Sequence, residues 1–176
     1  MPTRSILEPP YSEAARLYRY WAALPATRPR AALSPIAIGA RLLPHCSLAH
    51  VLEDGADLRY DLIGEVLEAV GPRVRPGSLA SAPLRVDPEN TNILGYLRDC
   101  ARGQRPVAFE AAFLSMDGVP RRVFSLLLPL SIEPEAAAAR DMLIGVWEVR
   151  RDPGPLYENY RDSTVWFCDA MAGGDG

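Results

Sequence analysis

The sequence predicts an α+β fold: a five-stranded, largely antiparallel sheet, with one helix before the first two strands and further helices between them and the last three. Two observations predict it. Strand-like runs fall in two blocks, at residues 46–64 and 106–151, and helical patterns stand before the first block and between the two. Asp-Gly turns in both blocks indicate hairpins, whose strands are antiparallel. Such blocks are typical of α+β domains and not of a doubly wound parallel sheet.

The N-terminal part predicts one amphipathic helix. Residues 1–10 read as a disordered lead-in. Ser12 suits the cap position of the following helix, and Glu13 is favourable in its first turn. Apolar side chains then recur at helical spacing, at Leu17, Trp21 and Leu24. Pro25 ends the helix, because proline disfavours helical geometry in the residue before it.

Residues 46–55 and 58–64 predict the first hairpin, with a turn around Glu53 to Asp57. Gly64 ends the second strand. The segment 65–71 is too short to be a stable helix alone and needs packing against the rest of the chain. The proline-containing stretch 72–86 shows no clear period and predicts a loop.

A longer helix should connect the two strand blocks. Asp87 suits its N-cap, Pro88 its first position, and Glu89 favours the helix dipole. Gly103 marks its end. Three strands are then predicted at 106–118, 120–132 and 142–151, with a hairpin turn at Asp117-Gly118. We expect a single domain over residues 11–151 and a partly helical tail over residues 152–176.

Composition excludes several classes of protein. The formal net charge is −3, which argues against a nucleic-acid-binding surface, and no apolar run is long enough for a membrane span. The N-terminus lacks an apolar signal core, so a cytoplasmic location is expected. All 19 basic residues are arginine, which suggests a bacterial origin. Three widely spaced cysteines, Cys46, Cys100 and Cys168, predict buried reduced thiols and no zinc site.

The common catalytic and nucleotide-binding motifs are absent from the sequence, so we expect no enzyme and no cofactor. His45 and His50 are the only histidines. A strand would place them on opposite faces, so a shared ligand is not expected. A haem or metal bound by one of them is the weaker alternative to an ordinary polar role.

Two carboxylates interrupt apolar strands and are the candidates for any pocket chemistry. Asp61 lies in the second strand and Glu110 in the third. Either could act as a base in a small enzyme, with a raised pKa. The ordinary interpretation is an ion pair with a neighbouring arginine, for which Arg59, Arg121 and Arg122 are available.

Aromatic residues crowd the N-terminal helix. This face predicts either packing on the sheet or a homodimer interface made by Leu17, Tyr18, Trp21 and Leu24. For the aromatic pair Trp166 and Phe167 in the tail, the same two alternatives apply: burial in their own domain or burial against a partner.

The order of elements resembles that of a PAS domain: two strands, short helices, one connecting helix and three strands. Over about residues 14 to 151, the segments resemble a bacterial PAS subfamily that often occurs as a single-domain protein; they are LYRYWAAL, LLPH, LRYDLIG, VLEAVG, GQRP, LLLPL and LIGVWEV. The subfamily pairs Tyr and Trp on its N-terminal helix and ends its second strand in glycine. Asp61 and Glu65 depart from its pattern, which commonly has arginine and a hydroxyl residue there.

The resemblance implies a ligand cavity between the sheet and the short helices. The segment after the second strand would be a movable wall, with Gly64, Glu65, Gly71 and Gly77 at its junctions. Gly64 would supply backbone freedom where the chain leaves the strand. Strand alternation then predicts one pocket face, made by Leu58, Tyr60, Leu62, Phe124, Leu126, Leu128, Leu143, Gly145 and Trp147. Leu17 and Trp21 would cover the opposite face.

The resemblance implies a sensory or regulatory module without catalysis, which acts through a protein partner or by dimerisation and can bind a small ligand. A carrier of an apolar small molecule is the first alternative. A small enzyme that uses a pocket carboxylate and an adaptor with a closed pocket are the others. The ligand, the partner and the direction of signalling are not encoded in any motif.

Overall fold

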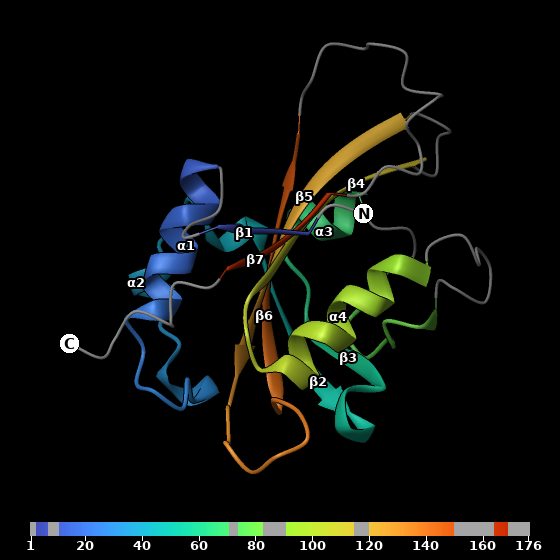
Figure 1. Cartoon of the computed structure of the whole chain (residues 1–176). Helices are drawn as coiled ribbons and strands as arrows, with labels where there is room; N and C mark the ends of the chain where they lie inside the picture. The colour runs from blue at the N-terminus through green and yellow to red at the C-terminus, as the bar shows by residue number, and fades with distance from the viewer. Residues whose placement is uncertain are drawn as a thin grey trace.

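The computed structural model describes residues 3–6, 11–70, 74–82, 91–114, 120–149 and 164–168. These residues form one twisted sheet with helices on both faces (Figure 1). The strands are β1 (Thr3–Ile6), β2 (Cys46–Leu52), β3 (Asp57–Leu62), β4 (Val107–Leu114), β5 (Pro120–Leu130), β6 (Asp141–Glu148) and β7 (Thr164–Cys168). The helices are α1 (Ser12–Ala22), η1 (Arg30–Ala32), α2 (Pro35–Ile38), η2 (Leu43–His45), η3 (Glu53–Gly55), α3 (Glu65–Val70) and α4 (Thr91–Gly103).

Five strands form the antiparallel sheet that the sequence predicts. In the described part of the chain, the strand order is β1-β7-β4-β5-β6-β2-β3. The pairs β4–β5, β5–β6, β2–β6 and β2–β3 are all antiparallel. Helix α1 precedes this sheet, and α3 and α4 connect β3 to β4. The fold is therefore PAS-like, and the predicted fold class is confirmed.

The two ends of the chain differ from the prediction. Residues 3–6, expected to be disordered, form β1, and residues 164–168, in a tail expected to be partly helical, form β7. Strand β7 pairs antiparallel with β4, and β1 pairs parallel with β7. The outer edge of β4 would otherwise present unpaired backbone groups. The sequence TVWFC suits this position, because β-branched and aromatic residues favour strands. The rest of both end segments lies outside the described residues.

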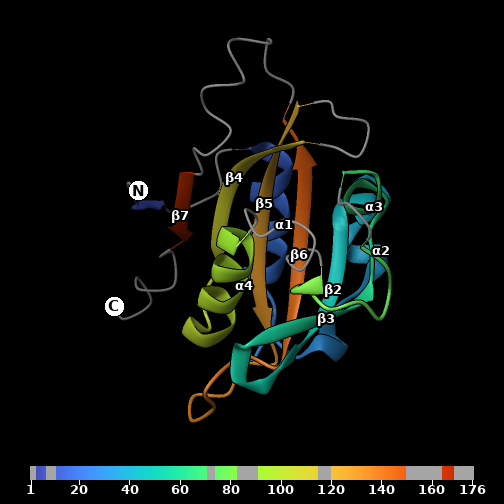
Figure 2. The ribbon, with the colours of Figure 1, turned by 90° about the vertical axis from the view of Figure 1, so that its right-hand side faces the viewer.

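Helix α1 begins at Ser12, and Tyr11 holds the cap position that was predicted for Ser12. The helix covers one face of the sheet, while α4 lies on the other (Figure 2). The side chains of Leu17, Tyr18 and Trp21 are buried between α1 and the sheet, and Leu24 is half-buried. Trp21 Nε1 donates to the Pro129 carbonyl at 2.8 Å. These four residues were candidates for a dimer interface; three of them are instead committed to the core of their own chain.

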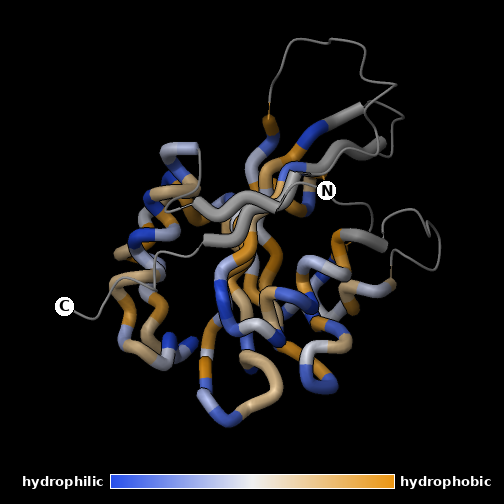
Figure 3. The backbone as a smooth tube through the Cα atoms, in the orientation of Figure 1, coloured by the Kyte–Doolittle hydropathy of each residue, from blue (hydrophilic) through white to orange (hydrophobic). Residues whose placement is uncertain are grey.

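The sheet separates two hydrophobic cores, and its central strands are largely hydrophobic (Figure 3). The core under α1 contains the β5 and β6 residues Phe124, Leu126, Leu128, Leu143 and Trp147. The core under α3 and α4 contains Leu58, Tyr60, Val123, Leu127, Met142, Ile144 and Val146. The predicted pocket face is therefore wrong as a single surface, because its members divide between the two faces.

The physical reason lies in the strand patterns. Both faces of β5 and β6 are covered and apolar, so alternation within them cannot say which residues share a face with β3. A register shift between Leu48 and Ala49 adds to the error, because it places Leu62 opposite Leu48. Leu62, predicted to line the pocket, is half exposed, at 50%.

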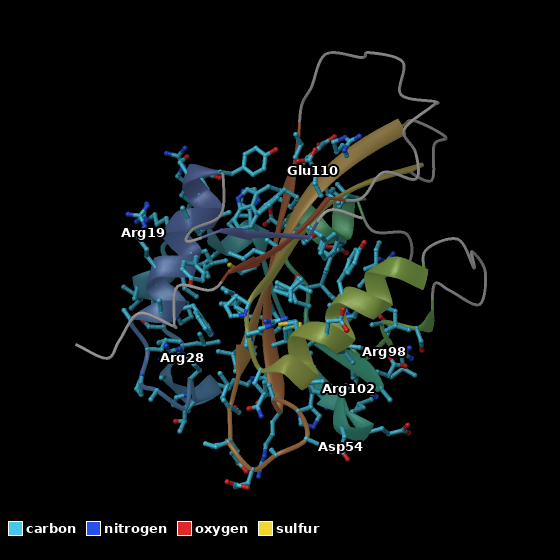
Figure 4. The ribbon with its side chains drawn as sticks, viewed as in Figure 1. Arg19, Arg28, Asp54, Arg98, Arg102 and Glu110 are labelled. Atoms are coloured by element: carbon cyan, nitrogen blue, oxygen red, sulfur yellow. The ribbon has the colours of Figure 1, made fainter. Side chains whose placement is uncertain are left out.

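The β2–β3 hairpin confirms its prediction, and its turn is the docking point of α4. Asp54 adopts a left-handed backbone with φ of 52°. Arg98 Nε donates to the Ala56 carbonyl at 2.6 Å, and Arg102 Nε donates to the Asp54 carbonyl at 3.1 Å (Figure 4). These bonds fix the longer helix to the hairpin. The residues predicted to cap α4, Asp87 to Glu89, and the Asp117-Gly118 turn lie outside the described residues.

A loop segment covers the outer edge of β3. Tyr60 N–H donates to the Ser78 carbonyl at 3.0 Å, and Ala80 N–H donates to the Leu58 carbonyl at 2.8 Å. Gly77 N–H donates to the Tyr60 carbonyl at 2.6 Å, from a turn in which Gly77 has a φ of +87°. The stretch predicted as loop therefore closes this edge of the sheet. No helix among the described residues is long and apolar enough to cross a membrane.

Candidate functional site

The candidate site forms where β6 continues beyond the start of β2. Strand β2 begins at Cys46, which is paired with Gly145, so the next residues of β6 pass the end of β2. Helix η2 turns the chain at this point. The His45 Nδ1 lies 2.8 Å from the Val146 carbonyl oxygen. Since a carbonyl can only accept, Nδ1 carries the proton, and the imidazole continues the hydrogen bonding of the strand edge.

An open cleft of about 550 Å³ occupies this position. Its described walls come from four elements: α1, η2, α3 and the end of β6. The lining residues are Glu13, His45, Glu65, Val66, Ala69, Val70, Trp147 and Glu148. Helix α3 packs on the core of one sheet face and α1 on the core of the other, so the cleft brings together parts of both layers.

Glu13 is the polar centre of the cleft. Its Oε2 accepts a hydrogen bond from Trp147 Nε1 at 3.1 Å, and its Oε1 accepts one from Arg41 Nε at 2.5 Å. His45 Nε2 lies 3.9 Å from Oε2. The hydrogen bond from Arg41 holds the pKa of Glu13 below its ordinary value, against the effect of burial. Glu13 is therefore a carboxylate at neutral pH.

The aromatic rings of His45 and Trp147 line the cleft beside Glu13. His45 stacks on Trp147 with ring centroids 5.4 Å apart and planes inclined by 16°. The Trp147 ring folds back over Gly145, where an added Cβ would lie 2.5 Å from the ring. Gly145 is thus required because a side chain at this position would displace the indole. Of the predicted pocket residues, Trp147 is the one that the cleft contains.

Gly64 fixes the entry to α3, and its role differs from the predicted one. A Cβ on Gly64 would lie 2.6 Å from the Cys46 carbonyl oxygen and 2.7 Å from that of Pro44. The Gly64 N–H donates to Ser47 Oγ at 2.9 Å. Glycine is needed here for close approach of two backbones, whereas conformational freedom was expected. Glu65 begins α3 and lines the cleft; Gly77 belongs to the β3 edge, and Gly71 lies outside the described residues.

Asp61 is held in an ion-pair network. It lies 2.6 Å from Arg30 Nη1 and 3.3 Å from Arg59 Nε. Hydrogen bonds from Arg30, and then from Arg59, lower the pKa of Asp61. This is the opposite of the raised pKa that suits a general base at neutral pH.

Glu110 is buried at 4% exposure, and it is labelled in Figure 4. Its carboxylate accepts hydrogen bonds from Arg122 Nη1 at 3.2 Å and from Tyr11 Oη at 3.0 Å. For both carboxylates, the predicted ion pair with an arginine is confirmed. Neither of them lines the cleft.

The histidines make separate contacts, as expected. His50 Nδ1 lies 3.1 Å from Asp141 Oδ1, in the network that contains Arg30. Among the described residues, no group of three or more His, Cys, Asp or Glu side chains is placed to hold a metal. Cys46 and Cys100 are buried free thiols, which confirms their prediction, and burial raises the pKa of Cys46 to about 12. The Cys168 side chain lies outside the described part of the chain.

The sequence reasoning missed most of the cleft. Glu13 was noted only as a favourable residue for a helix start, and its contact with Trp147 joins positions 134 residues apart. Val66, Ala69 and Glu148 carry no local signal of a site. The segment GVWEV was noted in the sequence, and Trp147 was predicted to line a pocket. Its contacts with Glu13 and His45 depend on how α1 and η2 pack against β6.

No protein-family model and no curated protein matches the chain. Among solved structures, it is similar to the LOV protein of Rhodobacter sphaeroides, with 16% identity, a TM-score of 0.46, and coverage of 61% of this chain and 60% of that one. It is also similar to an RNA-binding Light-Oxygen-Voltage receptor, with 19% identity, a TM-score of 0.41, and coverage of 65% and 33%. The match thus spans less than two thirds of these neighbours. Likeness at this level says nothing of ligand or partner, so a function has to rest on this chain's own geometry.

Proposed function

We propose that this chain is a non-catalytic sensory module of PAS-like fold, whose input is a small ligand in the cleft. The observation that carries the proposal is that the two walls of the cleft come from different layers of the fold. One wall is α3, from the face that carries α4, and the opposite wall contains Glu13 of α1 and His45 of η2. A ligand that touches both walls can change how α3 sits relative to the sheet.

The energetics of α3 support a movable wall. It has six residues, fewer than an isolated helix needs for stability in water. Of its apolar side chains, Val70 is buried, while Val66 and Leu67 are only partly buried. A small free-energy difference between two positions of α3 is thus expected. A ligand that binds one position more tightly shifts the population toward it. The output would be a protein partner, or a second copy of the chain, that recognises one position.

Native mass spectrometry of the freshly purified, untagged protein tests whether the cleft is occupied. We expect a discrete added mass that is lost on denaturation. Ala69→Trp should remove it, because the indole would fill the cleft from the α3 wall. Ala137→Trp is the matched control, since Ala137 is exposed on the β5–β6 loop, away from the cleft. Retention of the added mass by Ala69→Trp would contradict this site.

Hydrogen exchange separates a sensor from a carrier. The sensor hypothesis expects exchange of the α3 amides to change on removal of the ligand, while the β5 and β6 amides stay protected. Unchanged α3 exchange with a filled cleft would favour a carrier. A bare mass for the unmodified protein would favour an adaptor. Homodimerisation, a cytoplasmic location and a bacterial origin stay predictions. Light scattering tests the first, and the source of the gene tests the last.

A further inference from the structure

We propose that the ligand of this cleft is an organic cation: an ammonium or guanidinium group that carries a short apolar chain. The inference rests on the proposed function, and it adds the chemical class. The cation would bind Glu13 and His45 and displace Arg41, and the chain would lie along α3. Three features of the cleft lead to this class.

The first feature is a pair of acceptors. Because His45 Nδ1 donates to the Val146 carbonyl, Nε2 of the neutral ring is an acceptor. It lies 3.9 Å from Glu13 Oε2, which is also an acceptor. These two atoms cannot bond to each other in that state. A ligand nitrogen with two or more hydrogens can donate to both, and an ammonium group also carries the charge that complements the carboxylate.

The second feature is Arg41, a cation that the chain itself supplies to Glu13. Its Nε lies 2.5 Å from Glu13 Oε1, while its side chain is 78% exposed. The site therefore already binds a guanidinium group. Exposed ion pairs of this kind contribute little to stability, since solvent screens them. Arg41 can thus leave Glu13 at small cost when a better-placed cation arrives from the cleft.

The third feature is the lining of the remaining walls. Val66, Ala69 and Val70 lie three and four positions apart, so they form one apolar stripe of α3 along the cleft. Among the described lining residues, Glu13, Glu65 and Glu148 are carboxylates and none is an arginine. A cation is favoured by this field, and a ligand anion would be repelled.

Titration with n-hexylammonium chloride at pH 8 tests the class. The readout is the indole N–H signal of Trp147, identified in the NMR spectrum by its loss in Trp147→Phe. We expect n-hexylammonium to shift this signal in a saturable way, and n-hexanol and hexanoate to bind at least 10-fold more weakly. Equal binding of hexanol or hexanoate would overturn the cation class.

Two variants test the roles of the charged residues. Glu13→Gln should weaken n-hexylammonium binding at least 10-fold, while it keeps an oxygen acceptor for Trp147. Glu53→Gln is its control, because it removes one negative charge from an exposed residue in η3. Arg41→Gln should tighten binding several-fold by removal of the competing cation, whereas Arg16→Gln, at an exposed position of α1, should not. Equal binding by Glu13→Gln and the unmodified protein, or weaker binding by Arg41→Gln, would overturn the proposal.

The outcomes also separate this inference from the sensory function. A cleft that loses its native ligand in Ala69→Trp but ignores n-hexylammonium would refute the cation class and leave the sensor standing. Binding of n-hexylammonium through Glu13, with unchanged α3 exchange, would support the class and refute the sensor. Unchanged signals in every probe, with a bare native mass, would refute both.

Discussion

At the scale of single residues, three glycines show how differently the same residue type is used. Gly64 allows two backbone segments to approach, and Gly145 makes room for an indole ring. An added Cβ on Gly95 in α4 would meet no described atom within 4 Å beyond its own stretch of helix. The sequence marks all three in the same way. Their different surroundings lead to opposite expectations for the same substitution.

Gly64→Ala should destabilise the protein by about 1–3 kcal/mol, as overpacking does, because the Cβ would collide with the Cys46 and Pro44 carbonyls. Gly95→Ala should stabilise it by about 1 kcal/mol, because alanine favours the helix interior and its Cβ would collide with none of the described residues. Urea unfolding of both variants measures the two changes. A neutral Gly64→Ala variant would show that the entry to α3 is looser than described.

At the scale of elements, α1 is part of the core of the chain. Trp21 is almost fully buried and bonds to Pro129 of β5, and Arg28 places its guanidinium carbon 4.7 Å from the centroid of the Trp21 ring. Packing within its own chain therefore accounts for the aromatic side chains of this helix, and no partner chain is needed. A substitution at Trp21 should accordingly change the stability of the fold more than its state of association.

Trp21→Ala should destabilise the chain by about 3–5 kcal/mol, the usual cost of removing a large buried aromatic side chain. Thermal or urea unfolding measures the loss, and light scattering of the folded fraction measures the mass. Trp21→Phe should lose less stability, because it keeps most of the buried apolar surface. Its remaining loss comes from the smaller ring and the missing hydrogen bond to Pro129. A wild-type unfolding midpoint together with a halved mass would restore the interface interpretation.

At the scale of the whole molecule, an ion-pair network ties the loop after α1 to three strands. Arg30 Nη1 bridges Asp61 of β3 and Asp141 of β6, at 2.6 and 3.2 Å. Ser131 Oγ donates to Asp141 at 2.9 Å, and His50 of β2 contacts the same carboxylate.

The network predicts acid sensitivity. The pKa of Asp61 is lowered in the folded chain from an ordinary value of 3.8. Its contribution to stability is therefore complete above that value and is lost as pH falls through the lower, folded value. Asp61→Asn should reduce the stability at neutral pH and flatten its decline below pH 3.8. Urea unfolding midpoints across the acid range measure both effects, and a decline of unchanged slope in Asp61→Asn would contradict this role.

Local patterns were sufficient for much of the fold. The Asp-Gly turn predicted the β2–β3 hairpin, and helical spacing predicted α1. The apolar segments after Gly103 predicted the strands β4, β5 and β6. Asp61 and Glu110 were correctly interpreted as ion-paired, because a carboxylate in an apolar strand needs a cation nearby. Each of these conclusions depends on neighbours within one element or one hairpin.

The cleft and the division between the two cores depend on contacts that no local pattern carries. Strands β5 and β6 are apolar on both faces, so their sequence is compatible with either orientation. Strand β7 pairs with the free edge of β4, and β1 then pairs with β7. The presence of that edge depends on the folded sheet, so it cannot be inferred from the sequence of the two end segments. Glu13 meets Trp147 across 134 positions only after α1 and β6 have packed. Hydrophobic periodicity specifies which elements form, and the packing of those elements decides which side chains meet.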